Sequence, residues 1–308
     1  MTRLFLTPIW AAVGRALGAR DPDPRVRNPD SWAERLIGVE EYRSLGDHPL
    51  VRASYSTPDP ADRVEVLTAV RQMIVRTRFI DERLEAAVQR GVTQVVILGA
   101  GYDSRAYRLD ELLKPTHVFE VDHPDMQEVK RRRVAEVAPL AANVSYVACD
   151  LLKDDLQQCL NEAGYLSQAT TMFIWEGGTM YFPEFVVLRI LKWIATSNLT
   201  SCVVFDYTYA AIVEYFRRFR ENPGQTASSN PLMAFIQLTK NEPWIFGLPD
   251  RQEDAFLERI GLRLVKSVRF DSPEVVRKYL TRADGSVFAA DVRAGSVYLI
   301  LEAAVAGR

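Results

Sequence analysis

The apolar positions of this 308-residue chain fall into short β-branched runs separated by longer segments with helical spacing. Such runs are typical of buried strands in a parallel sheet, and spacing of i, i+4 is typical of helices that cover it. We expect strands at residues 95–98, 116–122, 144–148, 170–175 and 201–206, then at 262–270 and 296–304. We expect helices at residues 63–90, 124–137, 185–195 and 251–260.

Alternation of strand and helix predicts a single α/β domain over residues 1–308. Residues 1–62 have helical patterning, broken by proline-rich loops, and no strand pattern, so we expect a helical cap or lid. Residues 63–207 would form the cofactor-binding core, and residues 251–308 the last strands. The aromatic-rich residues 208–250 are predicted to be irregular. They would either line a substrate pocket or serve only to pack against the rest of the domain.

A glycine turn follows the first strand. Gly99 and Gly101 allow a sharp turn and close approach to a ligand, and Asp103 or Ser104 would begin the next helix. Strand, glycine turn and helix together form a nucleotide-type cofactor site. A dinucleotide fingerprint needs a third glycine where this chain has Ser104, which disfavours NAD. S-adenosylmethionine has no phosphates and does not need that geometry. A turn without a ligand is the remaining alternative.

Polar residues end the next three expected strands. Asp122 would accept hydrogen bonds from a ribose diol, in NAD and S-adenosylmethionine alike. Asp150 and Leu151 would bind an adenine amine and ring face. Glu176, followed by two glycines and the aromatic Tyr181, suits a sulfonium cation through charge and cation–π attraction.

Composition excludes several function classes. The net charge of −2 predicts no nucleic-acid partner, and no apolar run is long enough for a membrane helix. The N-terminal stretch is predicted to be an amphipathic helix rather than a signal peptide. Three scattered cysteines without a CxxC pair fit a reducing cytoplasm and predict no disulfide framework or zinc site. With only three histidines in addition, we expect no metal.

Two basic segments lie on expected helices. Residues 76–81, RTRFID, place two arginines beside a phenylalanine, and a solvated helical face is the plain interpretation. The basic run at residues 130–133 is also predicted to be a solvated surface.

These motifs together resemble the bacterial branch of the leucine carboxyl methyltransferase family, which uses S-adenosylmethionine. The similar stretches are RNPDSWAERLIG at 27–38, RTRFID at 76–81, VVILGAGYDSRAYRL at 95–109, FEVDHPDMQEVKRRR at 119–133, residues 150–151, and FIWEGGTMYFPEF at 173–185. The resemblance implies a seven-stranded, mostly parallel Rossmann-like methyltransferase sheet whose last strand is antiparallel.

The resemblance also implies roles for single residues. Arg76, or alternatively Arg78, would meet the cofactor carboxylate, and Tyr181 would lie near the reacting centre. The other implied cofactor contacts are Gly99 and Gly101 under the methionine portion, Asp122 at the ribose, Asp150 and Leu151 at the adenine, and Glu176 at the amino group. One departure concerns the substrate side, where the family commonly has aliphatic residues and this chain has Gly178 and Thr179.

We therefore expect an O-methyltransferase that makes a methyl ester from a small or carrier-bound acid. A carboxylate is ionised at pH 7 and needs no base, and no histidine follows the fourth strand. A phenol or alcohol acceptor is the alternative, and a protein C-terminus is less favoured. An NAD-linked oxidoreductase and a cofactor-binding protein without catalysis are the competing functions. The sequence leaves the oligomeric state open.

Overall fold

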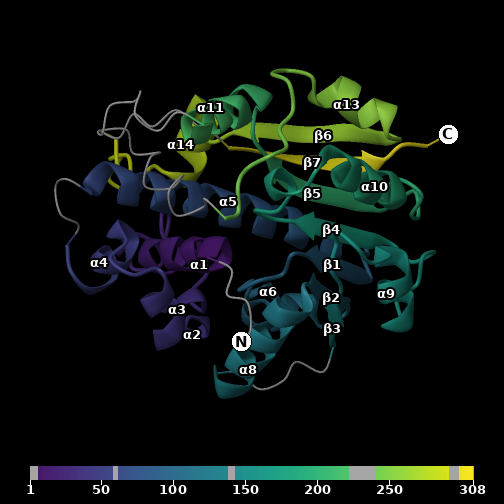
Figure 1. Cartoon of the computed structure of the whole chain (residues 1–308), viewed down its shortest axis with the longest axis horizontal. Helices are drawn as coiled ribbons and strands as arrows, with labels where there is room; N and C mark the ends of the chain where they lie inside the picture. Colours follow the sequence, from purple (N-terminus) through teal and green to yellow (C-terminus); the bar gives the residue numbers. More distant parts are fainter. Residues whose placement is uncertain (1–5, 58–61, 138–142, 222–240, 291–297, 308) are drawn as a thin grey trace.

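A seven-stranded sheet with helices on both faces forms the centre of the molecule (Figure 1). The computed structural model describes residues 6–57, 62–137, 143–221, 241–290 and 298–307. The strand order is β3-β2-β1-β4-β5-β7-β6. The strands are β1 Gln94–Leu98, β2 His117–Asp122, β3 Val144–Ala148, β4 Thr171–Trp175, β5 Cys202–Tyr207, β6 Leu262–Arg269 and β7 Leu299–Val305. All seven lie where the sequence predicted them, to within a few residues.

The first five strands are parallel, because a helical connection separates each from the next. Every residue of β1 is buried. Val95 and Ile97 belong to the core on one face of the sheet, whereas Val96 and Leu98 belong to the core on the other. Burial on both faces explains why this strand is a continuous apolar run and does not alternate with polar residues.

β7 runs antiparallel to both of its neighbours, β5 and β6. This confirms the predicted antiparallel last strand and the Rossmann-like methyltransferase fold. The arrangement brings Tyr298, immediately before β7, toward the carboxyl end of β5, since Leu299 pairs with Tyr207. A residue late in the chain thereby reaches the edge of the sheet where open α/β folds bind ligands.

The helices cover the two faces and one end of the sheet. The longest is α5, and the four short N-terminal helices α1 to α4 are grouped beside it as the predicted helical cap (Figure 1). The described helices have the following bounds: α1 Leu6–Gly18, α2 Ala33–Leu36, α3 Val39–Ser44, α4 Pro49–Tyr55, α5 Arg63–Gln89, α6 Arg105–Arg108, α7 Asp110–Leu113, α8 Pro124–Val137, α9 Leu156–Glu162, the 3₁₀ helix η1 Thr179–Tyr181, α10 Glu184–Ile194, α11 Ala210–Glu221, α13 Glu253–Arg259 and α14 Pro273–Tyr279.

Two expectations were wrong. Residues 210–221 were predicted to be irregular but form α11, in which Glu214 pairs with Arg217 and Arg218 one turn away and Phe216 faces the core. Residues 222–240 of the expected insertion lie outside the described residues. Lys130 was predicted to be solvated, yet it is buried and its Nζ lies 2.8 Å from Glu120.

None of the helices in the described part of the chain has the length and apolarity needed to cross a membrane.

Candidate cofactor pocket

The glycine turn after β1 has a conformation that suits glycine. Gly99 and Gly101 have φ angles of 64° and 41°, in the left-handed region. A Cβ on Gly101 would also lie 3.3 Å from the Cβ of Pro8 in α1. The absence of a side chain at Gly101 therefore lets α1 pack directly on the turn.

A pocket lies between this turn, the end of β4 and α1, with about 620 Å³ of empty space that is partly open to solvent. Five of the eight predicted site residues line it. They are Arg76, Gly99, Gly101, Glu176 and Tyr181. The other lining residues are Thr7, Pro8, Trp10, Ala11, Arg15, Ile97, Ala100, Tyr102, Asp103, Gly177 and Tyr298. The remaining three predicted residues, at the ends of β2 and β3, are not among them.

Arg76 is buried in α5 and is held by two carboxylates. Its Nε donates to Glu176 at 2.8 Å, and its Nη1 donates to Asp206 at 3.1 Å. The interpretation of RTRFID as a solvated face is thus wrong for Arg76, which is only 3% exposed. Arg78, its alternative, points elsewhere, because it donates to the backbone carbonyls of Pro24 and Arg27.

Arg105, the first residue of α6, is a second buried cation that holds Glu176. Its Nη1 donates to Glu176 at 2.7 Å and also to Asp103, and its Nε donates to Asp81 at 2.8 Å. Glu176 therefore lies between Arg105 on one side and Arg76 on the other. The two arginines fix the carboxylate that follows β4.

The same ion pairs continue into the cap. Arg108 bonds Asp81 at 2.7 Å and lies 3.9 Å from Asp30, which in turn pairs with Arg15 of α1 at 2.8 Å. Ser104 donates its hydroxyl to Asp30 at 2.5 Å. The residue that replaces the third glycine of a dinucleotide fingerprint thus fastens the cap loop to the core.

We call this set the arginine–carboxylate network. Its members are Arg15, Asp30, Arg76, Asp81, Asp103, Arg105, Arg108, Glu176 and Asp206. Four arginines face five carboxylates, so the network has one formal negative charge more than positive ones. A cationic group in the pocket would balance that excess.

Two acids of the network have shifted pKa values in opposite directions. Burial alone would raise the pKa of Glu176, but the attraction of Arg105 and Arg76 is stronger and holds it well below its usual range. Burial raises the pKa of Asp206 to about 6, although Arg76 acts against the shift. Glu176 is therefore a fixed negative charge at neutral pH.

The acids at the ends of β2 and β3 are held by backbone amides. Asp122 accepts from the amides of Gly101 at 2.6 Å and His123 at 2.7 Å, and burial raises its pKa. Asp150 accepts from the amide of Leu152 at 3.0 Å and pairs with Lys153 at 2.9 Å. The two ends are adjacent, since Cys149 donates its amide to the carbonyl of Asp122 at 2.8 Å.

Leu151 is almost fully buried in the core, and its carbonyl accepts from Arg189 at 2.5 Å. Its predicted place against an adenine, like the ribose and adenine roles of Asp122 and Asp150, stays a prediction.

Aromatic side chains form part of the pocket wall. Tyr181 from η1, Trp10 from α1 and Tyr298 all line the pocket, and Trp244 packs edge-on against Tyr298 at 4.9 Å. Burial raises the pKa of the Tyr181 hydroxyl far above its usual range. η1 is held in place because the Met180 carbonyl accepts from the backbone amide of residue 245 at 2.7 Å. Such a wall suits a cation or an apolar acceptor.

Gly178, at the position of the expected departure from the family, lies against Trp175. A Cβ at this glycine would lie 2.3 Å from the indole nitrogen of Trp175. An aliphatic residue would not fit here without movement of that indole.

Sequence reasoning missed several members of the arginine–carboxylate network. Arg15, Asp30, Arg105 and Asp206 were not singled out, although Asp206 ends the fifth expected strand as the other acids end theirs. The position of Asp206 at a strand end could therefore have identified it as a site residue. The spacing of Arg15 and Asp30 in the sequence gave no sign that they pair.

One protein family matches a large part of the chain. Residues 8–195 match the family described as leucine carboxyl methyltransferase, which is more than half of the sequence. The chain belongs to the leucine carboxyl methyltransferase family. The matched segment contains most of α1, the glycine turn and Glu176, and it ends before Asp206 and Tyr298.

Relatives of known sequence agree with this. A Mycolicibacterium smegmatis protein named "Putative S-adenosyl-L-methionine-dependent methyltransferase" is 38% identical over 192 residues, which span 62% of each chain. A Mycobacterium avium protein of the same name is 32% identical over 71% of each chain. The chain thus aligns with about three fifths of the length of the first of these relatives. The cofactor expected from the sequence, S-adenosylmethionine, is the one that these family members are named for.

Similarity to one solved structure supports the fold but says nothing about the activity. A DUF574 family protein from Streptomyces avermitilis has a TM-score of 0.55 at 14% identity, and the similarity covers 86% of this chain and 95% of that one.

Proposed function

We propose that this leucine carboxyl methyltransferase family member transfers a methyl group from S-adenosylmethionine to a carboxylate of a small or carrier-bound metabolite, forming a methyl ester. The observation that carries the proposal is the pocket itself. It combines a glycine turn at the end of β1, an arginine–carboxylate network with excess negative charge, and an aromatic wall.

The described residues fit the cofactor chemically. The fixed negative charge of Glu176 suits the amino group, and the aromatic wall with Tyr181 suits the sulfonium. Arg76 supplies the cation for the cofactor carboxylate, with its Nη2 next to the Met73 sulfur rather than to an acid. Bound S-adenosylmethionine supplies an already activated methyl group. The protein therefore needs mainly to orient the acceptor and to exclude water.

The lack of a suitable base favours a carboxylate acceptor. Among the described residues that line the pocket there is no histidine, and Glu176 is ionised and held by two arginines. Burial raises the pKa values of Tyr181 and Tyr298, so both hydroxyls keep their protons at neutral pH. A carboxylate is already ionised there and can attack the methyl group unaided.

One observation favours a hydroxyl acceptor as the second candidate. Asp206, with a pKa of about 6, lies directly behind Arg76 and could take a proton if that arginine moved. Because Asp206 is completely buried and already accepts from Arg76 and from the Gly177 amide, we rank this function second.

The first test is binding. Calorimetric titration with S-adenosylhomocysteine should give one site per chain, and NAD, the control, should give none. Binding of NAD alone would replace the proposal with an oxidoreductase. Binding of S-adenosylhomocysteine without methyl transfer to any acceptor would point to a cofactor-binding protein instead.

The second test separates the two acceptors. The chain is incubated with methyl-labelled S-adenosylmethionine and a panel of carboxylic acids and phenols, and the products are treated with alkali. A methyl ester releases volatile labelled methanol, whereas a methyl ether does not. Tyr181→Phe should change kcat/KM only slightly. A loss of about 10²–10⁴ in that variant would mean that Tyr181 takes part in proton transfer, which would favour the hydroxyl acceptor.

A further inference from the structure

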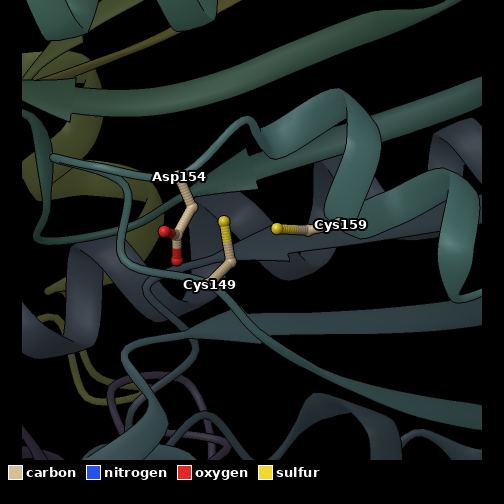
Figure 2. Close-up of side chains that lie close together, drawn as sticks. All are labelled: Cys149, Asp154 and Cys159. Atoms are coloured by element: carbon tan, nitrogen blue, oxygen red, sulfur yellow. The ribbon is translucent and has the colours of Figure 1, made fainter.

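Two of the three cysteines, which look scattered in the sequence, meet in the fold. Figure 2 shows Cys149, Asp154 and Cys159 with their side chains converging and the two sulfur atoms facing each other. Their two sulfur atoms and one carboxylate oxygen all lie within 4.8 Å of one another. The spacing of the cysteines, which includes no CxxC pair, gave no sign of this proximity. Cys202 lies apart from them in β5.

The chain positions these three side chains firmly. Cys149 follows β3 directly, and its amide is bonded to the Asp122 carbonyl. Asp154 closes a tight turn, because its carboxylate accepts from the Asp150 amide at 2.8 Å and its own amide donates to the Asp150 carbonyl at 2.8 Å. Cys159 lies in α9, whose N-terminus Asp155 caps. The three ligand atoms thus come from a strand end, a bonded turn and a capped helix.

We propose that Cys149, Asp154 and Cys159 form a binding site for a thiophilic divalent cation, Zn²⁺ in the first place. Tetrahedral zinc with zinc–sulfur bonds of about 2.3 Å places its sulfur ligands roughly 3.8 Å apart. Ligand atoms already within 4.8 Å need only small side-chain rotations to reach that spacing.

The donor set and the exposure of the site define its chemistry. Two thiolates and one carboxylate favour zinc over magnesium or calcium, which take oxygen ligands. Three protein ligands leave a fourth position for water. Cys149 is buried and Cys159 half-buried, whereas Asp154 is exposed, so the ion would enter from the solvent on the Asp154 side.

The site lies beside the residues expected to hold the adenosine portion of the cofactor. Cys149 and Asp154 flank Asp150 and Leu151 in the sequence, so a bound ion would join the two ends of that turn. This consequence rests on the proposed function. The binding site itself does not, because zinc binding can be measured without cofactor.

The experiment uses the full chain, kept reduced with a phosphine, in competition with a chromophoric zinc chelator. The chain should take up one zinc ion, and Cys159→Ser and Asp154→Asn should bind it much more weakly. Asp154→Asn keeps a hydrogen-bond acceptor for the Asp150 amide, so its fold should be unchanged. Cys202→Ser is the matched control and should bind zinc as the unaltered chain does.

Cadmium provides a second readout, since thiolate ligands give it a charge-transfer absorption in the ultraviolet. The band should appear with the unaltered chain and with Cys202→Ser, and it should weaken in Cys149→Ser and Cys159→Ser. The proposal fails if the chain does not compete for zinc. It also fails if the cysteine variants bind as tightly as Cys202→Ser, or if cadmium binds without the thiolate band.

Discussion

The end of β4 and the adjacent ends of β2 and β3 both carry acids, but the acids are held in different ways. Glu176 after β4 lies between two buried guanidinium groups that come from α5 and α6. Asp122 and Asp150, at the ends of β2 and β3, are held mainly by amides within a few residues or in the neighbouring turn. The first arrangement depends on distant parts of the chain, and the second is mostly local.

This difference separates two ways to prepare a binding site. At the β4 end the electrostatics of the pocket are part of the protein's own stability, because a lone buried charge is costly. At the β2 and β3 ends the acids can be changed with less effect on the fold. Substitutions at the first end should therefore affect unfolding as well as ligand affinity, whereas substitutions at the second end should affect mainly ligand affinity.

The largest effect is expected from Arg105→Ala. It leaves the carboxylates of Asp81, Asp103 and Glu176 without their shared cation, so the free energy of unfolding should fall by about 3–5 kcal/mol. Urea denaturation measures the change. Arg217→Ala, which removes an exposed cation of α11, is the control and should leave the midpoint where it is. Equal midpoints for both variants would contradict the role of the network in stability.

Arg76→Lys tests how the β4 end of the pocket contributes to ligand affinity. Lysine keeps the charge but cannot serve Glu176 and Asp206 with the geometry of a guanidinium. Affinity for S-adenosylhomocysteine should fall by about 1.5–3 kcal/mol through lost charge-assisted bonds. Arg78→Ala should leave the affinity unchanged, because Arg78 serves the cap loop. The reverse result in calorimetry would move the carboxylate contact to Arg78.

Asp122→Ala tests the other end. The affinity for S-adenosylhomocysteine should weaken by about 1–3 kcal/mol, since a ribose would lose its charge-assisted acceptor. Asp125→Ala, three residues later on α8, is the matched control and should bind normally. An unchanged calorimetric affinity in Asp122→Ala would remove the ribose assignment.

A pH dependence is expected from Asp206. Its pKa is raised in the fold from 3.8 to about 6 by burial, so the folded state holds this proton more tightly than the unfolded chain. That contribution to stability is complete below about pH 4 and is lost as the pH rises through about 6. Asp206→Asn should lack this decline in urea midpoints between pH 4 and 7. Parallel profiles for the two proteins would exclude Asp206 as its source.

The strands were predictable because each one is a local pattern. Residues 95–98 are all apolar and mostly β-branched, and a strand that is buried on both faces needs such a continuous apolar run. α11 was missed because its aromatic residues obscured a helix whose support comes from Glu214 and the arginines one turn later. Lys130 was misjudged because its partner Glu120 lies on a strand, and a run of basic residues gives no sign of which one turns inward.

The site residues that could be predicted are those at the carboxyl ends of strands and those in the family motifs. Gly99, Gly101, Glu176 and Tyr181 line one pocket because a parallel sheet brings its strand ends and following loops to one edge. The pairing of Arg15 with Asp30, and the meeting of Cys149 with Cys159, depend on how helices pack on that sheet. No spacing rule in the sequence encodes such contacts.

The start of α1 has a consequence for how the chain assembles. The amides of Leu6 and Thr7 both donate to the carboxylate of Glu242 at 3.0 Å, across more than two hundred residues. Helix amides need such partners, and closing so long a loop is slow compared with forming local structure. On the ribosome, α1 emerges long before Glu242 is made. The pocket wall formed by α1 can therefore gain these bonds only after synthesis has passed Glu242.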